Sequence, residues 1–144
     1  MIALASDHVG LELKREIMAH LEALGLPYKD FGTYSAERCN YPEFAFLAAS
    51  AVARGECEKG IVCCGTGVGI SIAANKVNGI RCALVSNEYS AEMTKRHNNA
   101  NMVAFGGRVT GPDLAKHILD AYVGAEFEGG RHEKRIEKIS ALEG

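Results

Sequence analysis

A thiol beside a glycine-rich loop is the feature of this sequence best suited to chemistry. Cys64 ends a short apolar run, and the loop GTGVG (residues 65–69) follows it directly. A helical pattern begins at Val68, so that a strand, a glycine loop and a helix come in that order. This order presents backbone N–H groups and a positive helix end to an anion. The same donors favour the thiolate of a neighbouring cysteine, so the segment predicts a base or nucleophile beside an oxyanion hole.

Other interpretations of this loop compete with the catalytic one. A dinucleotide-binding fingerprint requires G-x-G-x-x-G, and Ile70 occupies the position of its third glycine. A Walker loop requires a lysine directly after its last glycine, and none is present. A lone glycine loop is as often a tight turn, with Cys64 as one more small buried hydrophobe. The catalytic interpretation therefore depends on other chemical residues converging on the same place.

Composition limits the classes of protein to which the chain can belong. Its 144 residues suffice for one domain, which we expect to span residues 1–144. The formal net charge of −2 gives no electrostatic case for a nucleic acid or membrane partner, and no apolar run has spanning length. The N-terminus lacks the pattern of a signal peptide. The five cysteines have no zinc-binding spacing, so they indicate a reduced, cytoplasmic chain without a metal site.

Five apolar runs alternate with helical patterns along the chain. We expect strands at 2–5, 28–31, 60–64, 81–85 and 102–105. Helices are expected between and after them, including one that begins at Pro42 and others at 68–77, 88–98, 112–122 and 131–142. This alternation predicts a Rossmann-like, doubly wound α/β fold with a five-stranded parallel sheet. The expected strand order is 2-1-3-4-5, with an additional C-terminal helix and a switch point between strands 1 and 3.

Chemical residues follow three of the predicted strands. Asp7 and His8 follow the first strand, Cys64 ends the third and Arg108 follows the fifth. Asp7 and His8 alone would be explained by a helix cap and a surface imidazole. Because the carboxyl ends of parallel strands share one edge of the sheet, we expect these residues to converge there. That convergence favours catalysis by Cys64 over a structural turn.

Further candidates lie at helix ends. His97 and Asn98 close a predicted helix, where such residues also serve simply to end it. Arg131 and Arg135 are four residues apart and project from one helix face, for which a solvated basic surface is the usual explanation. We expect His132 to be exposed beside them.

Five motifs, taken together, resemble the ribose-5-phosphate isomerase B family. They are SDHVG (6–10), CGTGVGISIAANK (64–76), HNxxN (97–101), FGGR (105–108) and GGRHxxR (129–135), and the likeness covers essentially the whole chain. The resemblance implies a cofactor-free aldose–ketose isomerase that interconverts D-ribose 5-phosphate and D-ribulose 5-phosphate on a Rossmann-like fold. It also implies a homodimer or homotetramer with a shared active site.

The resemblance further implies a role for each candidate. Cys64 would be the base that moves a proton between C1 and C2 through a cis-enediolate, with Thr66 assisting, and His97 would open the sugar ring. The other residues would bind substrate: backbone N–H groups of Gly65, Gly67, Val68 and Gly69 at the enediolate oxygens, Asn98 near the reacting carbons, Asp7 at sugar hydroxyls, and His8, Arg108, Arg131 and Arg135 around the phosphate. One branch of the family replaces the cysteine by a glutamate directly after the third glycine. Ile70 at that position places this chain in the cysteine branch.

Three alternatives remain open from the residues themselves. The substrate could be a six-carbon sugar phosphate, as in the related allose and galactose 6-phosphate isomerases. A non-catalytic phosphate-binding module could use the same fold, although Cys64 and His97 argue against it. A cysteine-nucleophile hydrolase or thiol redox protein is the third, although no C-x-x-C pair is present.

Overall fold

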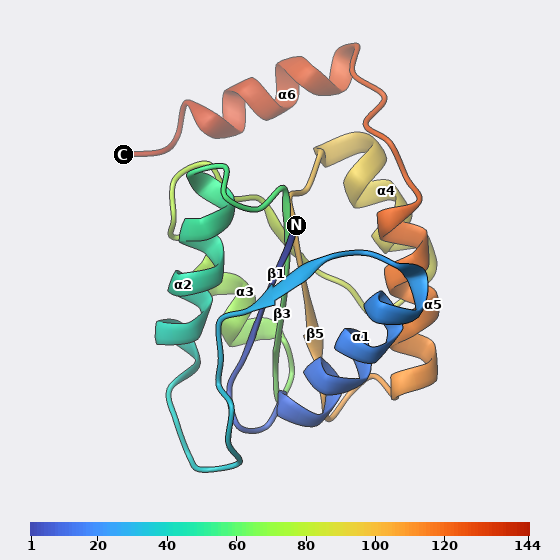
Figure 1. Ribbon diagram of the computed structural model, residues 1–144. Coiled ribbons are helices and arrows are strands. Elements are labelled where there is room, and N and C mark those ends of the chain that lie inside the picture. Colours follow the sequence, from blue (N-terminus) through green and yellow to red (C-terminus); the bar gives the residue numbers. More distant parts are fainter.

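A five-stranded parallel sheet forms the centre of the protein in a computed structural model that describes residues 1–144 (Figure 1). The strands are β1 (Ile2–Ser6), β2 (Tyr28–Asp30), β3 (Lys59–Cys64), β4 (Cys82–Leu84) and β5 (Met102–Gly106). The helices are α1 (Leu11–Leu24), α2 (Tyr41–Ala53), α3 (Val68–Ala74), α4 (Glu88–Asn98), α5 (Pro112–Val123) and α6 (Arg131–Ser140). The predicted α/β alternation and the additional C-terminal helix are therefore confirmed.

The order of the strands corrects the prediction at one edge. The sheet has the order β2-β1-β3-β5-β4, whereas 2-1-3-4-5 was expected. Every residue of β5 is buried, which suits a central strand of a parallel sheet. In contrast, β4 has only three residues, and Leu84 at its end is 43% exposed, which suits an edge. The more apolar strand thus takes the place beside β3, although it comes later in the chain.

Helices cover both faces of this sheet. On one face α2 and α3 pack on Val62 and Cys64, and on the other face α1, α4 and α5 pack on Ile61 and Cys63 (Figure 1). Cys63 and Cys64 therefore point to opposite sides, as strand alternation predicts. Because the chain passes from β3 to the edge strand β4 and then returns to β5, right-handed crossovers place α3 and α4 on opposite faces.

A buried lysine joins α1 to the end of β2. The Lys14 side chain is 1% exposed and its Nζ donates to Asp30 Oδ1 at 2.7 Å and to the Thr33 carbonyl at 2.6 Å. A buried charge is tolerated when it is paired and hydrogen-bonded in this way. The contact anchors the start of the loop between β2 and α2. This loop follows the end of β2 and therefore lies at the carboxyl edge of the sheet.

The two edges of the sheet carry different parts of the chain. The carboxyl ends of β1, β3 and β5 lie side by side, with Ser6 in register with Cys63 and Cys64 in register with Gly106. The C-terminal end of α4 lies at the opposite, amino edge, and α6 crosses above that edge (Figure 1). The Gly79 N–H donates to both carboxylate oxygens of Glu143, which ties the end of the chain to the same edge. No helix combines the length and the apolar character needed to cross a membrane.

Candidate active site

The Cys64 thiol lies in contact with the loop that follows it. Its side chain is buried, and the Gly67 N–H donates to its Sγ at 3.2 Å. Thr66 and Val68 are exposed on the loop, and the Val68 N–H donates to Thr66 Oγ1 at 3.2 Å. A sulfur atom with an amide donor against it, next to an exposed backbone turn, suits a group that moves a proton beside a developing oxyanion.

Close backbone packing determines the path of this loop. Gly67 has φ +83°, and a Cβ on it would lie 2.6 Å from Leu84 Cδ1 and 2.8 Å from the Phe105 carbonyl carbon. A Cβ on Gly106 would lie 2.5 Å from the Thr66 carbonyl oxygen. The loop therefore rests directly on the end of β5. Gly67 is therefore required by space as well as by backbone conformation.

Tyr41 is a site residue that the sequence analysis missed. A Cβ on Gly69 would lie 2.5 Å from Tyr41 Cζ and 2.7 Å from its hydroxyl oxygen, so the tyrosine ring lies against the glycine loop. Tyr41 begins α2, whose first turn contains Pro42. Nothing in the local sequence distinguishes this tyrosine from an ordinary residue at a helix start, because the contact joins α2 to the start of α3.

Asp7 and His8 lie at the end of β1, as expected. Asp7 Oδ1 accepts hydrogen bonds from the N–H groups of Val9 at 3.0 Å and Gly10 at 2.9 Å, so it shapes the turn into α1. His8 Nδ1 accepts from the Cys39 N–H at 3.3 Å. The loop between β2 and α2 thus orients the imidazole. Cys39 contributes this backbone donor.

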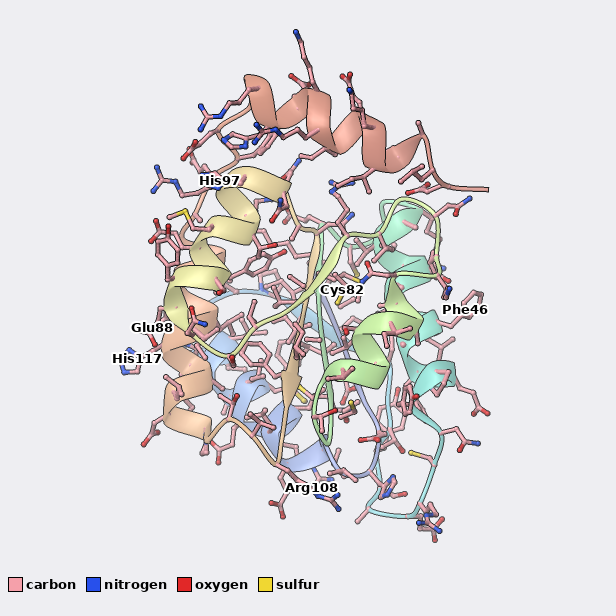
Figure 2. All side chains as sticks on the ribbon, turned by 180° about the vertical axis from the view of Figure 1, so that it is seen from behind. Phe46, Cys82, Glu88, His97, Arg108 and His117 are labelled. Atoms are coloured by element: carbon pink, nitrogen blue, oxygen red, sulfur yellow. The ribbon has the colours of Figure 1, made fainter.

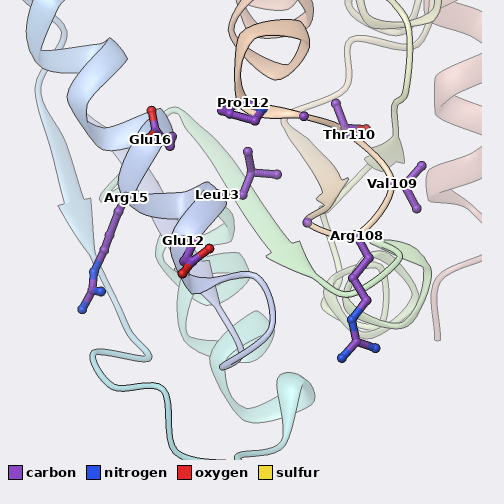
Figure 3. Close-up of a pocket in the computed structure, with 10 residues that line it drawn as sticks. Glu12, Leu13, Arg15, Glu16, Arg108, Val109, Thr110 and Pro112 are labelled. Atoms are coloured by element: carbon purple, nitrogen blue, oxygen red, sulfur yellow. The ribbon is translucent and has the colours of Figure 1, made fainter.

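Arg108 lies over the first residue of the glycine loop. The Gly107 N–H donates to the Cys64 carbonyl at 2.8 Å, and the Arg108 N–H donates to the Gly65 carbonyl at 3.0 Å. The Arg108 Nη1 atom is 4.0 Å from the Cβ position of Gly65. Arg108 also borders a hollow of about 500 Å³ between α1 and the β5–α5 loop (Figure 3). Cys64 does not line that hollow.

The remaining candidates lie at the other edge of the sheet. His97 and Asn98 form the last turn of α4, and Figure 2 shows His97 and Arg108 at opposite ends of the protein. Gly60 is hydrogen-bonded to Asn101, just beyond α4, and the strand from Gly60 to Cys64 is about 13 Å long at the usual rise per residue. Arg131 and Arg135 are exposed on α6, and this helix lies at the same edge as the end of α4 (Figure 1).

The structure therefore divides the predicted residues into two groups. The thiol group comprises Asp7, His8, Cys64, Gly65, Thr66, Gly67, Val68, Gly69 and Arg108, and it meets at the carboxyl edge as predicted. The imidazole group comprises His97, Asn98, Arg131 and Arg135, and it lies at the amino edge. One chain does not bring the two groups together.

His132 corrects a further expectation. It was expected to be exposed, but it is 5% exposed and its ring stacks on that of His97, with centroids 4.3 Å apart and planes 8° from parallel. Gly129 and Gly130 have positive φ angles of 69° and 59° and turn the chain back, so that α6 begins over the end of α4. Residue spacing could not reveal this contact, because it depends on the direction of that turn.

Comparison with known proteins gives a consistent result over nearly the whole chain. A family model described as Ribose/Galactose Isomerase matches residues 2–139. Ribose-5-phosphate isomerase B of Escherichia coli K12 is 55% identical over 142 residues, which are 99% of this chain and 95% of that protein. The structure of Clostridium thermocellum ribose-5-phosphate isomerase B matches with a TM-score of 0.97 and 53% identity, covering 99% of this chain and 96% of that one.

A structure with a bound sugar phosphate also matches. Ribose-5-phosphate isomerase B from Mycoplasma genitalium, with bound ribulose-5-phosphate, has a TM-score of 0.94 and 42% identity to this chain. The match covers 99% of this chain and 95% of that one.

The packing of the loop on β5 yields a prediction about stability. We expect Gly106→Ala to lower the free energy of unfolding by about 1–3 kcal/mol, because its Cβ would overlap the Thr66 backbone. Gly111→Ala is the matched control, since a Cβ there meets no atom within 4 Å and its φ of −68° suits alanine. Urea unfolding of both variants measures the difference. Equal midpoints for the two variants would contradict the packing argument.

Proposed function

The chain belongs to the ribose/galactose isomerase family and is an aldose–ketose isomerase, and we propose that it interconverts D-ribose 5-phosphate and D-ribulose 5-phosphate. The likeness to ribose-5-phosphate isomerase B along nearly the entire chain is the observation that supports this substrate pair. The family also includes galactose isomerases, so a six-carbon sugar phosphate is the second candidate. The reaction moves a proton between C1 and C2 and needs no electron acceptor.

Cys64 is the proposed base of the proton transfer. Its thiolate removes the proton from C2 of the open aldose, the electron pair shifts to the carbonyl oxygen, and a cis-enediolate results. The hydroxyl proton then passes from O2 to O1 while the thiol returns the first proton to C1, so that C2 becomes the carbonyl carbon of the ketose. Backbone N–H groups of Gly65, Gly67, Val68 and Gly69 stabilise the enediolate oxygens, and each such donor is typically worth about 3–4 kcal/mol. The Thr66 hydroxyl assists within the same loop.

His97 is the proposed acid–base group of ring opening, with Asn98 beside the reacting carbons. A pentose phosphate is mainly cyclic, so the anomeric hydroxyl must lose a proton while the ring oxygen gains one. His97 and Cys64 act on neighbouring atoms of one substrate, yet they lie at opposite edges of the sheet in one chain. This separation supports a site that two chains complete.

Exposed apolar side chains support such an assembly. On the face formed by α2 and α3, Phe46 is 60% exposed and Ile72 is 56% exposed, and Figure 2 shows Phe46 directed away from the protein. Just beyond the end of α6, Leu142 is 85% exposed. Burial of such residues contributes to association in obligate oligomers. We infer a homodimer, alone or within a tetramer, in which the imidazole group of one chain faces the thiol group of the other.

The charged residues of both groups fit a phosphorylated sugar. Arg131 and Arg135 can bind the phosphate with forked N–H groups, together with Arg108 and His8 of the facing chain. Asp7 uses one carboxylate oxygen in the turn before α1, which leaves the other oxygen for a sugar hydroxyl. A base that must stay a free thiol also favours a reducing compartment such as the cytoplasm.

A substrate panel tests the proposed reaction. We expect a kcat/KM for ribose 5-phosphate that exceeds those for allose 6-phosphate and galactose 6-phosphate by about tenfold or more, because a pocket shaped for one chain length discriminates to that extent. Ketose formation is measured for the three sugars side by side. Preferred turnover of a six-carbon sugar would favour the second candidate, and turnover of none would contradict the isomerase.

Replacement of the thiol tests the role of Cys64. We expect Cys64→Ala to lower kcat by about 10²–10⁴-fold, because the proton-transfer group is removed, with little change in ribulose 5-phosphate binding. Cys63→Ala is the matched control, because Cys63 is buried on the opposite face of the same strand. Steady-state assays and calorimetric binding measure both effects. Retention of most activity by Cys64→Ala would show that another group is the base.

A further inference from the structure

A carboxylate and two imidazoles meet where α6 begins over the end of α4. Glu128 Oε1 lies 3.7 Å from His97 Nε2 and 3.6 Å from His132 Nε2. The two rings are stacked and nearly parallel. One carboxylate oxygen is therefore shared between two ring nitrogens, just beyond hydrogen-bond length from each.

The second oxygen of Glu128 is already engaged. Arg96 Nε donates to Glu128 Oε2 at 2.8 Å, and the Glu128 N–H donates to the Arg96 carbonyl at 3.0 Å. Arg96 Nη1 also donates to Glu92 Oε2 at 2.8 Å. The arginine thus holds the Glu128 carboxylate by one oxygen and leaves the other directed at the imidazoles.

His132 has no partner that satisfies its buried nitrogen. Nε2 of His132 is inaccessible to solvent and makes no hydrogen bond. Burial, followed by the nearby charges of His97 and Arg131, lowers the pKa of His132, so its ring is neutral near pH 7. Buried polar atoms are rarely left without a partner, so this one calls for an explanation. The proposed chemistry uses His97 and assigns no task to His132.

A metal ion does not explain this cluster. His97, Glu128 and His132 offer ligand atoms within 4.8 Å of one another. A zinc ion binds imidazole in the plane of the ring at about 2.0–2.1 Å, which places tetrahedral ligand atoms about 3.3 Å apart. One ion cannot lie in the planes of two rings that are stacked in parallel.

We propose that Glu128 and His132 are positioning residues that fix the tautomer and the orientation of the His97 imidazole for ring opening. A carboxylate oxygen repels the lone pair of an unprotonated nitrogen, so it favours an N–H at Nε2 of each ring. The nitrogen of His97 left to act on the sugar is then Nδ1. His132 covers one face of the His97 ring and restricts its rotation, while 37% of the His97 side chain stays exposed to substrate.

This arrangement lets one nitrogen of His97 take a proton from the sugar and give it back. The proposal rests on the proposed function of His97 in ring opening. Nδ1 takes the proton of the C1 hydroxyl as the bond between C1 and the ring oxygen breaks, and then returns it to that oxygen. The imidazolium formed between these steps faces the Glu128 carboxylate. The other charged groups around the stacked rings, Arg96, Arg131 and Arg135, are cations, so Glu128 is the group that can balance the charge.

Glu128→Gln tests the carboxylate, with Glu92→Gln as the matched control. Each change removes one of the two carboxylates bound to Arg96, but only Glu128 approaches His97. We expect Glu128→Gln to lower kcat on ribose 5-phosphate by about 10- to 100-fold, as is common for groups that orient an active residue. Erythrose 4-phosphate cannot form a five-membered ring, so its turnover should fall far less. Equal losses on both sugars, or an equal loss in Glu92→Gln, would overturn the proposal.

Substitution of His132 tests the stacking contact in the same assay. His132→Phe keeps a flat ring against His97 and should retain most turnover of ribose 5-phosphate, whereas His132→Ala should lose about tenfold or more. Equal activity in the two variants would overturn the role of the stacked ring.

Nitrogen-15 NMR of the histidine side chains gives a readout that does not depend on activity. In the wild-type protein we expect the neutral His97 ring to carry its proton on Nε2, and we expect Glu128→Gln to shift this tautomer toward Nδ1–H. A wild-type ring protonated on Nδ1 would overturn the positioning role even in an active isomerase. An inactive wild-type protein with the expected tautomer would contradict the proposed function and leave the positioning intact.

Discussion

The direction of the strands is the constraint on which the whole arrangement depends. In a parallel sheet every loop after a strand lies at the carboxyl edge, and every helix that returns the chain ends at the amino edge. Cys64 ends a strand and His97 ends a helix, so the length of the sheet separates them. No local rearrangement of loops can close that distance. If Cys64 and His97 act on one sugar, as we propose, they must therefore come from two chains.

The position of β5 explains how the residues around Cys64 are arranged at the carboxyl edge of the sheet. Because β5 lies beside β3, Gly106 supports the backbone of the glycine loop and Gly107 donates to the Cys64 carbonyl. The same neighbour places Arg108 over Gly65. In the expected order, with the fourth strand between them, these contacts would be too far apart to form. The strand order thus brings a cation next to the glycine loop.

Local patterns in the sequence predict most of the fold, and long-range packing accounts for what they miss. The helix 88–98 follows from periodicity, and the convergence of polar residues at the ends of β1, β3 and β5 follows from strand direction. The order of β4 and β5 depends on which of the two strands is more completely buried. A local sequence pattern describes one strand at a time and does not compare the two. The burial of His132 depends on the turn at Gly129 and Gly130, and the contact of Tyr41 with Gly69 joins two separate elements. These contacts exist only after the chain has folded.

Complementation between two inactive variants tests the shared site most directly. Cys64→Ala and His97→Asn chains are mixed, unfolded and refolded, and hybrid dimers are confirmed by native mass spectrometry. If each site takes Cys64 from one chain and His97 from the other, half of the dimers are hybrids with one intact site each, which restores about a quarter of the wild-type activity in a twofold-symmetric dimer. Confirmed hybrids without activity would show that both residues serve one site from the same chain and would contradict this account.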